Sequence, residues 1–327
     1  MSTPRAEWES VRLMARVLTL YYEEGRNQAQ VAAELRLSAA KVNRLIKQAK
    51  EQGLVEIKIH TPFQSAFDLE DRLTSTFGIK DAVIVPQVSD NPESEMAAIG
   101  RAGSSRLLRS LRDGDVICIS GGKAVYEVVN ATEPKARYDV VVVPATGGVQ
   151  GRYHTDVNFL ASELAARLGG KAYQLHAPIF VDTPEEKRAL LNVRQIREVL
   201  ERARKADIAV VGVGGVIPRT SSFFDLLSAN DAEHERVIAN PAARGELFGH
   251  VFDEDGALCA PELSGRLIGV DIDDVRRVPL SIGVAAGSQK VAPISGVLRG
   301  GYLKTLVTDE PTAFSLLDAQ TTLDRKD

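Results

Sequence analysis

The sequence has few cysteines and lacks a long apolar run. Its two cysteines, Cys118 and Cys259, lie far apart, so neither a disulfide framework nor the paired spacing of a zinc site is present. Cys118 falls within the apolar run Val116–Ile119 and is expected to be a buried small hydrophobic residue. No stretch approaches the length of a membrane span, and the N-terminus lacks the pattern of a signal peptide. We therefore expect a cytoplasmic protein with no membrane, metal or cofactor partner.

The charge is unevenly distributed along the chain. The net charge is −4, but residues 1–60 hold ten Lys or Arg and seven Asp or Glu, a net of +3, which leaves −7 for the rest. A small basic head on an acidic body is typical of a DNA-binding protein with a separate regulatory domain. Because +3 is modest, we expect several copies to act together in order to make enough phosphate contacts.

Residues 27–58 show two short helical patterns around a tight turn at residues 36–38, which is the layout of a helix-turn-helix. Ser38 is placed to cap the second helix, and Gly53 follows its last turn. The apolar residues recur at helical spacing: Val31, Ala32 and Leu35 in the first helix, and Val42, Leu45, Ile46 and Ala49 in the second. An earlier helix over residues 11–23 would complete a three-helix core.

Polar and basic residues alternate with the apolar positions of the second helix. Asn43 and Arg44 fall in its first turns, where a recognition helix faces base edges, and these residue types bind adenine and guanine bidentately. Lys47 lies farther along and is expected at a phosphate. The residues predicted to contact DNA are Gln28, Ser38, Lys41, Asn43, Arg44 and Lys47. Residues 55–60 alternate like a short strand, which suggests a wing, and a merely solvated basic face is the alternative interpretation.

From residue 81 onward, apolar runs alternate with helical patterns. Runs that suit strands of a parallel sheet, buried on both faces, occur at 82–85, 116–119, 140–143, 208–213, 281–285 and 303–307. Helical patterns occur at 65–77, 93–111, 157–168, 184–205, 289–298 and 311–317. This order predicts a doubly wound, Rossmann-like α/β domain, with ligands at the carboxyl ends of its strands. We assign residues 1–60 to DNA binding and 61–327 to effector binding and oligomerisation.

Glycine-rich segments follow four of the expected strands: Gly121–Lys123, Gly147–Gly148, Gly212–Gly215 and Gly287–Lys290. Glycine lets backbone N–H groups approach an oxygen-rich ligand, and the two lysines would neutralise a carboxylate or phosphate. A purely structural role of glycine is the alternative for each loop. Neither a dinucleotide fingerprint nor a Walker motif is present. The predicted effector-binding residues are Gly121, Gly122, Lys123, Gly147, Gly148, Asp156, Asn158, Gly287 and Lys290.

Several motifs, taken together, point to one family. In the head they are Tyr21–Gly25, Gln28–Ala32, Lys41–Ile46 and Gly53–Ile57, and in the body Ala177–Val181, Ala206–Gly214 and Arg299–Glu310. Over about residues 10–320 the sequence resembles the SorC/DeoR-type family of bacterial sugar-binding transcriptional regulators. The resemblance implies a body similar to the sugar-phosphate isomerase and glucosamine-phosphate deaminase fold. It also implies a homo-oligomer, dimer or tetramer, on the operator DNA of a carbohydrate operon.

The effector implied by the resemblance is a sugar, a sugar phosphate or a polyol, and the glycine loops match the family's effector rim by position. Two departures stand out. Lys123 and Ala124 occupy positions where many relatives carry a hydroxyl residue after the glycines, which leaves room for an unphosphorylated polyol. Asn43 replaces a common serine, which suggests a different operator sequence.

Two further functions remain open beside that of a regulator, expected as a repressor. One is a sugar-phosphate isomerase or deaminase, although fold alone does not imply that activity. The five histidines are scattered, and His154, which lies close to Asp156 in the sequence, is the candidate base, with an ordinary polar loop histidine as the alternative. The other is a DNA-binding scaffold whose affinity no small molecule changes.

Overall fold

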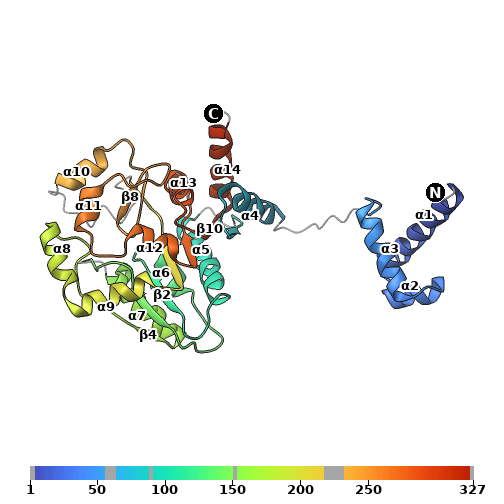
Figure 1. Ribbon diagram of the computed structural model, residues 1–327, viewed down its shortest axis with the longest axis horizontal. Coiled ribbons are helices and arrows are strands. Elements are labelled where there is room, and N and C mark those ends of the chain that lie inside the picture. Colours follow the sequence, from blue (N-terminus) through green and yellow to red (C-terminus); the bar gives the residue numbers. More distant parts are fainter. Residues whose placement is uncertain (1–3, 56–63, 88–90, 150–152, 217–231, 325–327) are drawn as a thin grey trace. The chain divides into compact units, whose positions relative to one another are not determined.

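The computed structural model describes residues 4–55, 64–87, 91–149, 153–216 and 232–324. The chain divides into two compact units, Met1–Pro62 and Phe63–Asp327 (Figure 1). Each unit has its own hydrophobic core, and the strand expected at residues 55–60 lies outside the described residues apart from Val55.

The N-terminal unit is helical. Its elements are α1 (Pro4–Leu18), the π-helical turn η1 (Thr19–Glu23), α2 (Gln28–Leu35) and α3 (Ala39–Glu51). Their apolar faces meet in one core, whose buried members are Met14, Val17, Leu20, Val31, Ala32, Val42, Leu45, Ile46 and Ala49. The spacing that predicted a three-helix core therefore describes the packing, because each face repeats every three or four residues.

Side-chain caps fix the starts of α2 and α3. Asn27 and Gln30 form a capping box at the start of α2, with N–H to oxygen distances of 3.0 and 2.9 Å. Ser38 accepts a hydrogen bond from the Lys41 N–H at 3.2 Å and caps α3, as predicted. The helix-turn-helix geometry is thus specified by local chemistry as well as by the core.

The larger unit contains a parallel seven-stranded sheet in the order β1-β10-β9-β5-β2-β3-β4. The strands are β1 (Asp81–Val85), β2 (Val116–Ile119), β3 (Val141–Pro144), β4 (Lys171–Ala172), β5 (Ile208–Gly212), β9 (Leu280–Val284) and β10 (Thr305–Asp309). Each apolar run expected to form a strand does so, and β10 begins two residues later than predicted. The doubly wound α/β fold is confirmed.

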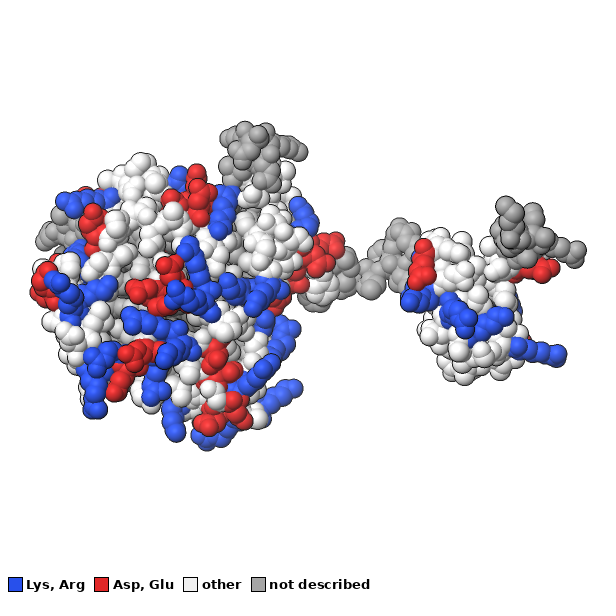
Figure 2. Space-filling model, viewed as in Figure 1, with Lys and Arg blue, Asp and Glu red and all other residues white. Residues whose placement is uncertain are grey.

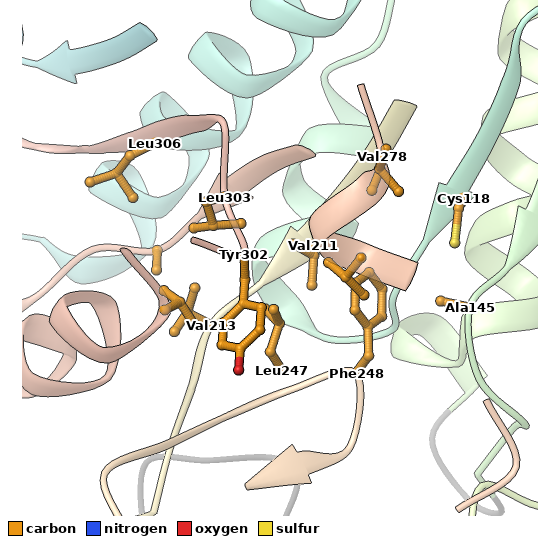
Figure 3. Close-up of a cluster of buried hydrophobic side chains, with 14 of the residues drawn as sticks. Cys118, Ala145, Val211, Val213, Leu247, Phe248, Val278, Tyr302, Leu303 and Leu306 are labelled. Atoms are coloured by element: carbon orange, nitrogen blue, oxygen red, sulfur yellow. The ribbon is translucent and has the colours of Figure 1, made fainter. Parts of the chain in front are cut away.

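Helices cover both faces of this sheet. One core joins it to α5 (Pro92–Leu108), α6 (Lys123–Asn130) and α7 (Val157–Leu168). The other joins it to α4 (Gln64–Phe77), α9 (Arg194–Arg204), α12 (Ile272–Arg277), α13 (Val291–Arg299) and α14 (Glu310–Asp324). Side chains alternate between the faces, so Ile117 and Ile119 enter the first core and Cys118 the second (Figure 3). Cys118 is buried, as expected, and its burial raises the pKa of the thiol to about 12.

The remaining elements were not all foreseen. A small antiparallel sheet consists of β6 (Gly214–Gly215), β7 (Gly245–Leu247) and β8 (His250–Phe252). The other elements are α8 (Pro184–Leu191), α10 (Ala232–Ala239), α11 (Pro261–Arg266) and the short helices η2 (Tyr153–Thr155) and η3 (Ser288–Lys290). The single helix predicted at 184–205 is wrong: Val193 is extended, with ψ of 119°, and separates α8 from α9.

Candidate functional site

The predicted recognition residues lie on one face of α3. Lys41, Asn43, Arg44 and Lys47 are exposed, and the opposite face is buried in the core. Figure 2 shows Lys and Arg side chains spread across the visible face of the N-terminal unit. Helix α3 therefore presents to solvent polar and cationic side chains of the types that can bind base edges and phosphates, while its other side anchors it in the core.

Some cations of this unit are already held by carboxylates. Arg26 lies 2.9 Å from Glu24, and Arg16 lies 3.3 Å from Glu34, so both arginines brace the region around α2. Such exposed pairs contribute little to stability, but they occupy the guanidinium groups.

The basic residues of α3 differ in how firmly they are engaged. Lys50 lies 6.0 Å from the Tyr22 ring, and Lys47 forms a loose, exposed pair with Glu51 at 3.9 Å. Within the described residues, Lys41 and Arg44 make no ion pair and remain available to an external partner. The cations with the fewest internal contacts are thus those at the start of α3.

Gln28 and Ser38 stand at the N-termini of the two helices. Gln28 is the first residue of α2 and is partly exposed, and Ser38 has its hydroxyl oxygen engaged as the cap of α3. Both flank helix starts, where N–H groups and the helix dipole favour a phosphate.

In the larger unit, sheet order brings the four glycine loops together. Strands β9, β5, β2 and β3 are consecutive neighbours and all parallel, so the loops that follow them leave the sheet at the same edge. From β2 the chain builds the sheet outward to β3 and β4, and from β5 it builds outward on the other side to β9 and β10. Open α/β sheets form a crevice for ligands where these two directions diverge, here between β5 and β2.

The loop after β2 ends in an open helix start. Gly122, with φ of 106° and ψ of 164°, precedes α6, which has no side-chain cap. The Gly122 N–H donates to the Thr155 carbonyl at 3.0 Å. A Cβ on Gly121 would lie 2.7 Å from the same carbonyl oxygen, so close packing requires glycine there. Lys123 is exposed and follows directly.

The N–H groups of the loop after β3 bind other segments of the chain. The Gly147 N–H donates to the Ile268 carbonyl at 2.8 Å, and the Gly148 N–H donates to the Ala177 carbonyl at 2.9 Å. A Cβ on Gly147 would fall 2.2 Å from the Pro178 carbonyl oxygen. These glycines therefore seat a neighbouring segment, and their N–H groups already have partners.

Asp156 and Asn158 are also tied into the fold. Asp156 caps α7 and accepts hydrogen bonds from the N–H groups of Asn158 at 2.9 Å and Val149 at 3.0 Å. The side-chain oxygen of Asn158 accepts from the Leu175 N–H at 2.7 Å. Together they line a cleft of about 660 Å³ with Gly148, Val149 and residues 175–180. The structure thus places Asp156 and Asn158 in the wall of this cleft.

The loop after β9 meets a carboxylate that the sequence did not reveal. The Gly287 N–H donates to Asp309 at 2.9 Å and to the Thr312 hydroxyl at 2.8 Å. Lys290 then lies within the electrostatic reach of Glu246. Burial lowers the pKa of Lys290, and the Glu246 carboxylate opposes that shift.

Glu246 lies on β7, where its side chain is mostly shielded from solvent between β6 and the turn that joins β7 to β8. Its Oε2 accepts the Gly249 N–H at 3.0 Å, and a Cβ on Gly214 would lie 2.3 Å from its Oε1. Burial raises the pKa of Glu246 to about 7, although the Gly249 hydrogen bond and Lys290 both lower it. A carboxyl group with a pKa near neutrality can donate a hydrogen bond to a ligand hydroxyl when protonated and accept one when ionised.

Two further tests concern metals and membranes. Among the described residues, no group of three or more His, Cys, Asp or Glu side chains is placed to hold a metal ion. Within the same residues, no helix combines the length and apolar character needed to cross a membrane.

Comparisons with known proteins identify the family. Residues 61–318 match the family model described as "Putative sugar-binding domain". The chain belongs to this family, and the resemblance to SorC/DeoR-type sugar-binding transcriptional regulators is confirmed.

Curated relatives span almost the full chain. The sorbitol operon regulator of Klebsiella pneumoniae is 31% identical over 314 residues, covering 94% of this chain and 98% of the relative. The deoxyribonucleoside regulator of Bacillus subtilis (strain 168) is 31% identical over 315 residues, covering 95% and 98%. The crystal structure of full-length SorC from Klebsiella pneumoniae has a TM-score of 0.74 at 29% identity, over 94% of this chain and 98% of that one.

Proposed function

We propose that the protein is a transcriptional repressor. Its affinity for operator DNA is controlled by a sugar, sugar phosphate or polyol. The proposal rests on two features: an exposed cationic face on α3, and four glycine loops at the strand ends of a separate unit. The names of its relatives, which include the erythritol catabolism regulatory protein EryD of Brucella abortus (strain 2308), support control of a catabolic operon.

In this proposal α3 enters the major groove. Asn43 and Arg44 read base edges, with Lys41 beside them, and Lys47 meets a phosphate. The helix starts at Gln28 and Ser38 approach the sugar-phosphate backbone. Because the N-terminal region carries only a modest positive charge, we propose a dimer or tetramer that places two or more heads on one operator.

The effector lies across the ends of β2, β5 and β9. The open start of α6, with Gly121, Gly122 and Lys123, faces an oxygen-rich group, and Lys290 with Glu246 binds hydroxyls. The cleft framed by Gly147, Gly148, Asp156 and Asn158 forms the adjoining wall. The protein acts by binding and not by catalysis, in keeping with relatives that are named as regulators.

A chain of contacts leads from the loop after β9 to α4, the helix that follows the N-terminal unit in the sequence. Gly287 binds Asp309, and the next residue, Glu310, accepts a hydrogen bond from the Ser65 hydroxyl. Ser65 lies in the first turn of α4, the first described element after the N-terminal unit. We propose that effector binding shifts the population of two arrangements of this contact and thereby alters the spacing of the heads.

The test is fluorescence anisotropy of the full chain on DNA from upstream of its own operon, titrated with sugars, polyols and their phosphates. A compound that changes the affinity supports the regulator and identifies the effector. DNA binding that no member of the panel changes favours the scaffold, and turnover of a sugar phosphate favours the isomerase or deaminase.

A further inference from the structure

An arginine occupies a backbone conformation that favours glycine. Among the described residues only Arg36 and Phe248 are non-glycine residues with positive φ. Arg36 has φ of 52° and ψ of 44° and closes α2 in the left-handed region. Glycine or asparagine is the usual choice at this helix end, because a Cβ clashes with the backbone there. A strained exposed residue invites a functional explanation.

Nothing inside the N-terminal unit accounts for the arginine. Its side chain is exposed and, in the part of the chain that the structure describes, it makes no ion pair. Arg16 and Arg26 differ in this respect, because Glu24 and Glu34 hold them. The left-handed conformation lets the backbone N–H groups of Arg36 and Leu37 donate to carbonyls at the end of α2. Glycine would form the same backbone bonds, so they do not explain the arginine side chain.

Arg36 lies close in the sequence to the start of α3. It lies two residues before Ser38, the cap of α3, and so stands at the entrance of the helix that carries Lys41 and Arg44. Within the described residues, Arg36, Lys41 and Arg44 make neither an ion pair nor a contact with an aromatic ring. A guanidinium at that entrance meets the DNA backbone when the first turns of α3 enter the major groove.

We propose that Arg36 binds a backbone phosphate of the operator, and that its left-handed conformation aims the guanidinium at this phosphate. The inference rests on the proposed regulator function and adds a contact that positions α3 without reading sequence. Arginine binds a phosphate through two parallel hydrogen bonds, whereas glycine at the same position would relieve strain and remove the contact.

The test compares the full-length chain with R36G, R36K and the control R12A, whose arginine lies on the Trp8 ring at 5.3 Å. Operator affinity is measured by anisotropy over a range of salt concentrations. We expect R36G to weaken binding on the order of fivefold per head and to reduce the salt slope by about 1 per head, equally on operators with altered bases. R36K should keep the slope, and R12A should behave like the parent chain.

Stability supplies an independent readout. Pulse-labelling hydrogen exchange of the backbone N–H groups of α2 and α3 along a urea gradient gives the unfolding midpoint of the N-terminal unit, because Trp8 is 61% exposed and its emission would change little. R36G should raise the unfolding midpoint while it weakens DNA binding. Unchanged affinity and slope in R36G would overturn the phosphate contact, and a lowered midpoint would overturn the account of strain. A parent chain that binds no operator DNA would instead remove the regulator function itself.

Discussion

Protonation of Glu246 should control the stability of the larger unit near neutral pH. Its pKa rises from 4.5 to about 7 because burial penalises the charged form. Each pKa unit corresponds to 1.36 kcal/mol, so the full shift corresponds to about 3 kcal/mol. Between these two pKa values the folded chain holds a proton that the unfolded chain has released. Stability therefore falls as the pH rises through this window.

The variant E246Q isolates this effect. Glutamine retains an oxygen that can accept the Gly249 N–H, but it carries no charge. We expect E246Q to be more stable than the parent chain by up to about 3 kcal/mol at about pH 8, with little difference at about pH 5. The lowered pKa of Lys290 acts in the alkaline range below 10.5, where it makes stability rise with pH, so the two effects have opposite signs.

The assay is urea unfolding followed by circular dichroism at several pH values, with hydrogen exchange of α2 and α3 used to separate the N-terminal unit. The control is E262Q, because Glu262 is exposed at the start of α11. A pH dependence that is equally steep in E246Q and the parent chain would refute the assignment of this proton to Glu246. Loss of the dependence in E262Q would refute it as well.

Three further changes separate the DNA-binding and effector functions. R44A should weaken operator binding by about 1–3 kcal/mol and leave effector affinity intact in a direct titration; equal loss of both would contradict its placement. K290A should keep operator affinity but weaken the response to effector, measured as the shift in anisotropy midpoint, and an unchanged response would remove this lysine from the site. S65A should bind operator and effector separately but lose coupling between them, whereas the control S75A, on the same helix, should retain it.

Local chemistry explains why parts of the fold were predictable. The helix predicted at 157–168 has the observed bounds, because Asp156 caps its start and Gly169 adopts a left-handed conformation at its end. Both signals lie within one turn of the helix that they delimit. The cap at Ser38 was visible in the sequence for the same reason.

Long-range contacts explain what the sequence did not show. Glu246 and Lys290 are far apart in the chain, and β7 is too short to give a strand pattern. The one signal in the sequence is a lone acidic residue among the glycine and apolar residues of 245–249. The partners of Gly147 and Gly148 lie on segments near residues 177 and 268, so only the folded chain reveals that their N–H groups are taken.

The coupling route through α4 is consistent with the energies that regulation requires. A coupling free energy of about 1–3 kcal/mol changes affinity roughly 5- to 150-fold. The exposed hydrogen bond between Ser65 and Glu310 contributes on the order of 1 kcal/mol, at the lower end of this range, if it forms in only one arrangement. Neither core of the sheet then has to repack, because Asp309 and Glu310 follow β10 directly and Asp309 also caps the turn at Thr312 with a 2.6 Å hydrogen bond. A ligand that moves the loop at Gly287 therefore acts on Asp309 at the end of β10. The next residue, Glu310, accepts the hydrogen bond from Ser65 of α4.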